Sequence, residues 1–313
     1  MVDNLVVNRS RLEHARELVR GAYDLHVHVG PDVMTRGIDD LALAERFLER
    51  GLAGFGLKSH YTSTAERAQV VSKAVPGIDA VGTLTLNGAV GGLNPLAVEI
   101  AAREGARIVW LPTVDAVNEA SARDRDYGPG VHRPLWAAIQ IELRDAGVEV
   151  PPVAVVDAKG EPLPELVAVL ELVARHDLIL ATGHLSRDEI FAVVPAALDA
   201  GVRQVVVTHP EFPAQDLSVA DQVALAERGA LLERCFTTPH TGKCTWERVF
   251  EGIRATGVER NLLSTDLGQP ANPPVEDGLA LFAAELLGAG FSDDEVRTMT
   301  VVNSRRLAGA QVA

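Results

Sequence analysis

Apolar runs and amphipathic segments alternate along almost the whole chain. Residues 178–181 and 205–207 are continuously apolar, which is typical of strands buried on both faces in a parallel sheet. Such runs predict strands at residues 22–29, 53–59, 79–86, 107–112, 178–183, 203–208, 230–236 and 261–265. Apolar residues at helical spacing between them predict helices at 39–51, 64–75, 94–105, 164–176, 187–200, 218–228 and 245–257.

Eight strands, most of them followed by a helix, predict an α/β protein with the (β/α)8 architecture of a TIM barrel. The 313 residues exceed the length of about 250 residues that is typical of this barrel. We therefore predict a single barrel domain over residues 1–313. A further helix at residues 5–20 is expected to pack under the barrel or against its first strand.

Residues 113–163 interrupt the alternation. They begin with a stretch rich in charge, glycine and proline, and then predict a helix at 134–146 and a short strand at 152–156. Because the segment follows the fourth strand, it emerges on the face where barrels build active sites. We interpret this insertion as a lid or substrate-binding segment in preference to a second domain.

The composition indicates a large core and an acidic surface. Hydrophobic residues make up 47% of the chain, and the formal net charge is -14. Such a surface repels nucleic acid and anionic membranes, so we expect a small-molecule substrate, no nucleic-acid or membrane partner, and leave a homo-oligomer open. Two cysteines are too few for a disulfide framework. Without a signal peptide or a membrane-spanning apolar run, the sequence predicts a cytoplasmic protein.

The segment Asp24-Leu25-His26-Val27-His28-Val29-Gly30-Pro31 is typical of a strand whose end opens into a loop. Residues two apart in a strand share a face, so we expect His26 and His28 to project together, with Leu25, Val27 and Val29 on the other face. Two converging imidazoles make half of a divalent-metal site. Asp24 is either a partner that orients one imidazole or only a residue at the strand start.

Other metal-ligating residues also stand at predicted strand ends. Lys58 and His60 end the second strand, His184 the fifth, His209 the sixth, and Asp266 the eighth. Five of the nine histidines therefore share this position. Because the carboxyl ends of barrel strands meet on one rim, we predict a shared metal centre.

This set resembles the amidohydrolase superfamily. The matching elements are the His-x-His of the first strand, the histidines after strands five and six, and the aspartate after strand eight. The C-terminal Asn303-Ser304-Arg305-Arg306-Leu307-Ala308-Gly309 is also similar to an Asn-Pro-Ala-Arg-Leu-hydrophobic-Gly segment of that superfamily. The resemblance implies a compact, barrel-only, metal-dependent hydrolase that binds one or two divalent ions, with Zn²⁺ as the first expectation. It implies that His26, His28 and Asp266 hold one ion, and that His184 and His209 hold a second or orient the substrate.

One departure concerns the bridging ligand. Many binuclear members carry a carboxylated lysine after strand four, where this chain has Trp110-Leu111-Pro112-Thr113. Lys58 is the candidate substitute. If carboxylated, it would bridge two ions as a metal ligand, and otherwise its ammonium would contact a substrate anion. For His60 three roles stay open: metal ligand, transition-state hydrogen-bond donor, or a residue behind the ligands.

The implied chemistry is attack by a water molecule that the ion activates. We expect Asp266 to accept that water's proton and return it to the leaving group. Tyr61 and His132 are the first candidates for substrate contact, followed by Arg36 and His240. Other residues near the expected loops are Thr62, Tyr127, Arg234, Thr237 and Gln269. Glu211 and Glu233 lie near the ends of strands six and seven, where a structural role for either stays open, and Cys235 is interpreted as a core residue.

The sequence leaves three hypotheses about the function open. The leading hypothesis is hydrolysis of a C–N or C–O bond in a cyclic amide, a lactone or a related small molecule. A second is a mononuclear, metal-dependent decarboxylase of the same superfamily, which fits the missing strand-four lysine. A third is a non-catalytic barrel with a structural metal, against which stands the carboxylate in the ligand set.

Overall fold

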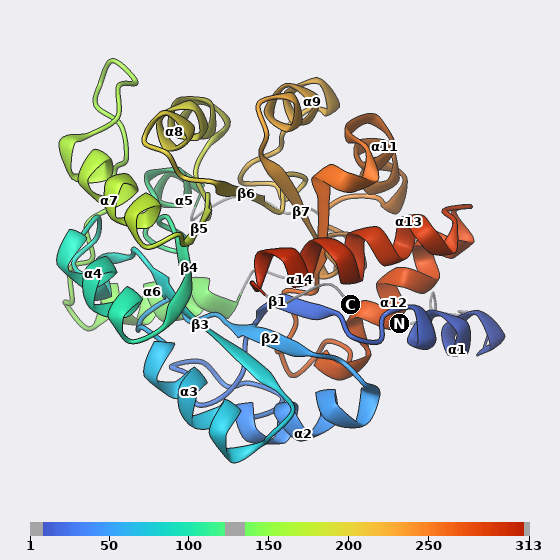
Figure 1. Ribbon diagram of the computed structural model, residues 1–313. Coiled ribbons are helices and arrows are strands. Elements are labelled where there is room, and N and C mark those ends of the chain that lie inside the picture. The colour runs from blue at the N-terminus through green and yellow to red at the C-terminus, as the bar shows by residue number, and fades with distance from the viewer. Residues whose placement is uncertain (1–8, 123–134, 310–313) are drawn as a thin grey trace.

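A computed structural model describes residues 9–122 and 135–309, and Figure 1 shows how their strands and helices are arranged. One parallel sheet contains all the named strands, each paired with the next along the chain. The strands are β1 (Tyr23–Val27), β2 (Gly54–Leu57), β3 (Asp79–Thr85), β4 (Ala106–Trp110), β5 (Ile179–Ala181), β6 (Gln204–Thr208), β7 (Leu231–Cys235) and β8 (Asn261–Ser264). Each of the eight predicted barrel strands is therefore present, most of them shorter by a few residues.

The sheet closes into a barrel between its first and last strands. Val27 in β1 forms a parallel bridge with Leu267, which lies just beyond β8. The backbone N–H of Asp266 donates to the His26 carbonyl at 2.8 Å, and that of His28 donates to the Leu267 carbonyl at 2.8 Å. The predicted (β/α)8 barrel is confirmed.

Helices cover the outside of the barrel (Figure 1). The longer ones are α1 (Arg9–Leu18), α2 (Asp40–Arg50), α3 (Ala65–Ala74), α4 (Pro95–Arg103), α7 (Pro164–Arg175), α8 (Arg187–Asp199), α9 (Val219–Glu227), α11 (Trp246–Thr256) and α12 (Val275–Gly288). The short ones are η1 (Gly88–Val90), α10 (Thr237–His240), η2 (Val258–Arg260), α13 (Asp293–Arg297), η3 (Thr298–Val302) and α14 (Asn303–Leu307). Among the described residues, none of the helices combines the length and apolar character that crossing a bilayer requires.

Two of the longer helices differ from the sequence-based expectation. The predicted helices at 39–51 to 245–257 are all present, but α12 was not predicted, because its apolar residues surround most of the helix and leave no amphipathic pattern. The N-terminal helix α1 packs against α12 in the outer layer and not under the barrel. Both helices contribute to the same hydrophobic cluster.

The C-terminal segment seals one end of the barrel. Leu307 and Ala308 pack on interior residues that include Leu25 and Trp110. The Asn303 side chain donates to the Asn261 carbonyl at 2.7 Å, at the start of β8. The segment with the superfamily-like sequence therefore closes the barrel at the start of its strands, away from the expected catalytic rim.

Strand β1 does not alternate strictly. Its register with β2 shifts between Asp24 and Val27, and Leu25 lines the barrel interior beside Trp110. Val27 and Val29 instead pack in the cluster of the outer helices. The prediction that Leu25 shares a face with the two valines is therefore wrong, because the irregularity turns the strand between these positions.

The insertion between β4 and β5 contains α5 (Val117–Ala122) and α6 (Leu135–Asp145). The second of these corresponds to the helix predicted at 134–146. The strand predicted at 152–156 is not formed, because Val153 and Val156 make only isolated bridges. Pro151 and Pro152 lack the backbone N–H that a strand ladder needs.

Gly183 allows β4 and β5 to approach each other directly before His184. Its φ is +62°, and a Cβ at this position would lie 2.4 Å from the Leu111 carbonyl oxygen. Only glycine combines this backbone conformation with such a close contact. The placement of His184 therefore depends on the residue that precedes it.

We expect Gly183→Ala to lower the free energy of unfolding by about 3 kcal/mol, because the added Cβ must displace backbone atoms. Gly290→Ala is the matched control: its φ is +85°, yet a Cβ added there would have no heavy atom within 4 Å, so the loss should be about 1 kcal/mol. Urea denaturation measures both. Equal losses would contradict the steric explanation.

Candidate metal centre

Five imidazoles form a closed ring at the carboxyl ends of the strands. Successive ring centroids are 5.5 Å apart for His26 and His28, 4.9 Å for His28 and His60, and 6.1 Å for His60 and His184. The ring closes with 5.0 Å from His184 to His209 and 6.1 Å from His209 to His26. All five side chains are buried. The structure thus brings together every histidine that the sequence placed at a strand end.

Asp266 joins this ring between His26 of β1 and His28, which directly follows β1. Its Oδ1 lies 3.2 Å from His26 Nε2 and 3.1 Å from His28 Nε2, and its Oδ2 accepts a hydrogen bond from the Thr237 hydroxyl at 3.0 Å. These three candidate ligand atoms all lie within 4.8 Å of one another. Burial raises the pKa of Asp266, but the neighbouring imidazoles outweigh it and hold that pKa well below its usual range.

Lys58 lies at the centre of the same group. Its Nζ is 2.8 Å from His26 Nε2 and 5.0 Å from the centre of the Trp110 ring. Burial lowers the pKa of this amine, while Asp266 and Glu233 raise it less strongly. The end of β4 therefore contributes an indole beside Lys58, where the superfamily resemblance would have supplied a lysine.

Two buried carboxylates support the ring from behind. Glu233 Oε2 lies 3.2 Å from His26 Nδ1, and Glu119 Oε1 lies 2.8 Å from His184 Nδ1. A carboxylate on one ring nitrogen fixes the orientation of the imidazole and leaves the other nitrogen for a metal. The sequence analysis missed Glu119 and left the role of Glu233 open.

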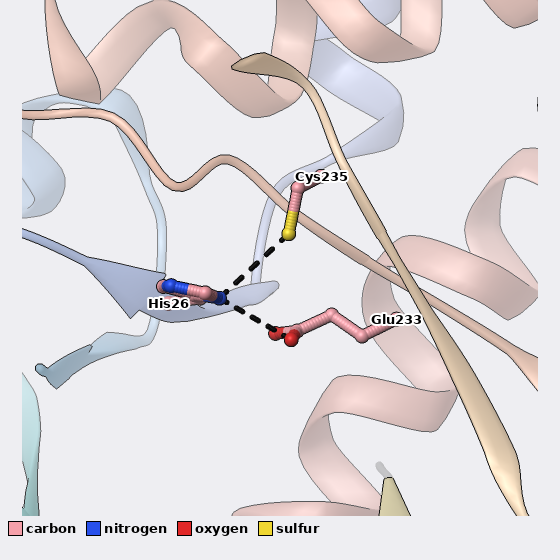
Figure 2. A group of neighbouring side chains, drawn as sticks. All are labelled: His26, Glu233 and Cys235. Carbon is pink, nitrogen blue, oxygen red and sulfur yellow. Dashed lines mark hydrogen bonds and ion pairs between the residues drawn. The ribbon is translucent and has the colours of Figure 1, made fainter. Parts of the chain in front are cut away.

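Cys235 also borders His26. Figure 2 shows the Cys235 thiol and the Glu233 carboxylate directed at the same end of the His26 ring, with 3.7 Å between Cys235 Sγ and His26 Nδ1. These three residues also satisfy the distances of a metal-binding group. Burial raises the pKa of Cys235 well above its usual value, so the thiol keeps its proton and packs against His26 as a core residue.

Most of the imidazoles are held neutral. Burial, followed by neighbouring charged or imidazole groups, lowers the pKa of His28, His60, His184 and His209 well below the usual value. Neutral imidazole is the form that binds a metal ion. Within the described chain, the buried His209 Nδ1 has no hydrogen-bond partner. A donor set of neutral imidazoles and one ionised carboxylate fits a divalent transition metal such as zinc.

The backbone is strained at two of the candidate ligands. His209 has a φ of +29° and Asp266 a φ of +54°, in the left-handed region that residues other than glycine rarely adopt. Such conformations persist where surrounding contacts impose them, and they concentrate at functional sites. For Asp266, the backbone hydrogen bond to His26 is one of these contacts.

Asp24 orients backbone and not an imidazole. Its carboxylate accepts hydrogen bonds from the Thr265 hydroxyl at 2.5 Å, from the Thr265 N–H at 3.0 Å and from the His26 N–H at 3.3 Å. Burial raises the pKa of Asp24 to about 7. Asp24 therefore joins β1 to the end of β8: it lies two residues before His26, and its partner Thr265 directly precedes Asp266.

The predicted substrate-contacting residues occupy different environments. The Tyr61 ring lies 6.3 Å from that of His60, and its buried hydroxyl has no hydrogen-bond partner within the described ranges. Arg36 pairs with Asp32 at 2.5 Å and lies 3.4 Å from His28 Nδ1. His240 stacks on Phe236. His132 and Tyr127 lie outside the described residues, and the substrate roles of all these residues stay predictions.

Arg234 does not face the site. It is fully buried and its guanidinium bonds to Glu211, to Gln222 at 2.6 Å and to Asn261 at 2.7 Å. Because side chains alternate along a strand, Glu233 and Cys235 of β7 point inward and Arg234 points outward. Its inclusion among the possible substrate contacts was wrong.

We expect Glu119→Gln to weaken Zn²⁺ binding about 10–100-fold, because a neutral amide makes a weaker hydrogen bond with His184 Nδ1 than an ionised carboxylate does and therefore orients the ring less firmly. Competition with a chelating dye measures the affinity, and thermal unfolding checks the fold. Glu171→Gln, at an exposed position of α7, is the matched control. Unchanged affinity in the Glu119 variant would show that this carboxylate does not support a metal ligand.

The fold is shared with solved structures at low sequence identity. The "probable dipeptidase PvdM" from Pseudomonas aeruginosa matches with a TM-score of 0.62 and 13% identity, over 96% of this chain and 98% of that one. An amidohydrolase from the same organism matches with a TM-score of 0.58 and 10% identity, over 95% and 97%. A "probable 2-pyrone-4,6-dicarboxylic acid hydrolase" from Acinetobacter baumannii matches with 0.55 and 12%, over 92% and 99%. The chain therefore shares its barrel fold with these proteins, which is the fold that the sequence analysis expected.

Comparison by sequence gives a narrower family. No curated protein matches the chain. A family model described as "Family of unknown function (DUF6282)" matches residues 21–233. This range begins before β1 and ends within β7, so it includes all five ring histidines and both supporting glutamates. The chain belongs to this family of unknown function, DUF6282.

Proposed function

We propose that this protein is a metal-dependent hydrolase that cleaves a C–N or C–O bond in a small molecule such as a cyclic amide or a lactone. The observation that carries the proposal is the group formed by His26, His28 and Asp266 at the ring of buried imidazoles, four of which are held neutral. Two proteins of similar fold support the class of reaction, since their names describe a dipeptidase and a pyrone-dicarboxylic acid hydrolase.

The residues divide into two ligand sets. His26, His28 and Asp266 would hold one divalent ion, for which we propose zinc, while His184 and His209 would hold a second or orient the substrate. When bound, such an ion activates water and polarises the bond to be cleaved. Glu233 and Glu119 hold the imidazoles of His26 and His184.

Asp266 is the proposed proton carrier. Its low pKa keeps the carboxylate ionised, so it is ready to accept a proton from the attacking water and deliver it to the leaving group. The Thr237 hydroxyl donates to Oδ2 at 3.0 Å and fixes the rotation of the carboxylate. His60, bonded through Nδ1 to the Thr113 hydroxyl at 2.9 Å, is then a further ligand, a donor to the substrate carbonyl, or a residue behind the ligands.

A mononuclear decarboxylase is the second candidate. The observation that favours it is the apolar end of β4, where Trp110 lies beside Lys58 and no lysine is available to bridge two ions. Carboxylation of Lys58 would restore such a bridge and favours the binuclear hydrolase. A non-catalytic barrel with a structural metal remains a third hypothesis, against which the single carboxylate in the ligand set argues.

The insertion fits a lid within the same domain. The Trp136 ring of α6 lies 6.1 Å from that of His184, and the Gln140 side chain donates to Asp115 at 2.7 Å. These contacts hold α6 against the catalytic rim. We propose that the described parts of the insertion, residues 113–122 and 135–163, cover a small-molecule substrate of a cytoplasmic enzyme that acts without nucleic acid or membrane.

To test the function, Zn²⁺-loaded protein is assayed against lactones, cyclic amides, dipeptides and aromatic carboxylic acids, the last for decarboxylation. With the best substrate, Asp266→Asn should lower kcat about 10³-fold, because the amide cannot carry the proton. Asp294→Asn, exposed on α13, is the control and should retain activity. A near-wild-type rate in Asp266→Asn, with normal metal content and unfolding midpoint, would refute the proton-carrier role.

If Lys58 is carboxylated, the protein should bind about two ions per chain, and Lys58→Ala should bind about one or none and lose turnover. Elemental analysis counts the ions, and ¹³C NMR after growth in labelled bicarbonate detects the carbamate. Lys73→Ala, exposed on α3, controls for loss of a lysine. Full metal content with normal activity in Lys58→Ala would exclude the bridge.

A further inference from the structure

Lys243 stands on the same rim as the candidate metal centre. It follows α10, and its backbone N–H donates to the Thr238 carbonyl at 3.0 Å. Its Nζ donates to the Thr241 hydroxyl at 2.7 Å, which itself donates to the Thr237 carbonyl at 2.6 Å. The turn that carries Lys243 therefore begins at Thr237, the residue whose hydroxyl holds Asp266.

The Lys243 ammonium has no close counter-charge. Its side chain is partly buried, but no carboxylate of the described residues lies within 4 Å of Nζ, and Asp266 acts on it only from a greater distance. Arg36, the cation that lies 3.4 Å from His28 Nδ1, is instead paired with Asp32 at 2.5 Å. Removing an ammonium from water without a partner is unfavourable, so an anionic ligand at this position would stabilise it.

An apolar surface separates Lys243 from the histidines. The Phe212 ring lies 5.8 Å from Lys243 Nζ, 4.9 Å from the His209 ring and 6.0 Å from the His184 ring. A single phenyl ring thus spans the distance between the ammonium and the imidazoles. A short carbon chain on Phe212 would place one end at Lys243 and the other at the metal centre.

We propose that Lys243 binds a carboxylate of the substrate, and that Phe212 supports the carbon chain between this carboxylate and the bond to be cleaved. The substrate class is then a small organic acid whose carboxylate is separate from the reacting group. Lys243 is a specificity-determining residue in this proposal, which rests on the proposed hydrolase function. A metal ion bound by Asp266 would leave the Lys243 charge still less compensated and strengthen this preference.

The test compares two probes that differ by one carboxylate, glutarate and butyrate. Isothermal titration of the Zn²⁺-loaded protein should show glutarate binding about tenfold or more tightly than butyrate, because a charge-assisted hydrogen bond contributes that much. Lys243→Met should remove the preference and Lys243→Arg should retain most of it. Lys73→Met, an exposed lysine on α3, removes the same charge and should leave the preference unchanged.

The proposal is overturned if wild-type protein shows no preference for glutarate, or if Lys243→Met keeps it. Thermal unfolding of each variant shows that a lost preference does not come from a lost fold. Failure of the hydrolase function would appear separately, as absence of metal-dependent turnover, while the ratio of the two affinities is measured without any reaction.

Discussion

The backbone hydrogen bond from Asp266 to the His26 carbonyl is the contact on which the candidate centre depends. It joins the first and last strands, so it closes the barrel and at the same time places Asp266 against His26 and His28. Asp24 adds a second link by accepting hydrogen bonds from Thr265. The contacts that close the barrel therefore also assemble the site. The same contacts maintain the positive φ of Asp266.

Burial and the charged side chains around the site determine which of its imidazoles are protonated. Five imidazoles crowded within one ring could not all be protonated, and burial lowers the pKa of four of them. For His26, burial and Lys58 lower the pKa, but Glu233 and Asp266 outweigh them and raise it. Glu233 and Asp266 thus offset the effect of Lys58 on the pKa of His26, while the remaining histidines stay neutral and available as ligands.

The sequence predicted the ring because its members obey a local rule: each follows a buried strand, and the carboxyl ends of barrel strands meet. It could not predict Glu119, because this residue lies on α5 in the insertion after β4, and its contact with His184 depends on the route that the insertion takes through space. Leu25 and Arg234 were misjudged for a different reason. A register shift in β1 and the alternation of β7 decide which way these side chains point, and neither is visible from residue type. The strand expected at 152–156 failed because two prolines remove its donors.

The two ends of the barrel perform separate tasks. At the start of the strands, the C-terminal helix fills the interior with Leu307 and satisfies the β8 backbone with Asn303, contacts that only stabilise the fold. At the other end, close backbone approaches such as that at Gly183 and left-handed residues such as His209 cost stability. A resemblance between C-terminal segments therefore reports how the barrel is closed, whereas the chemistry depends on residues that the closure brings to the opposite rim.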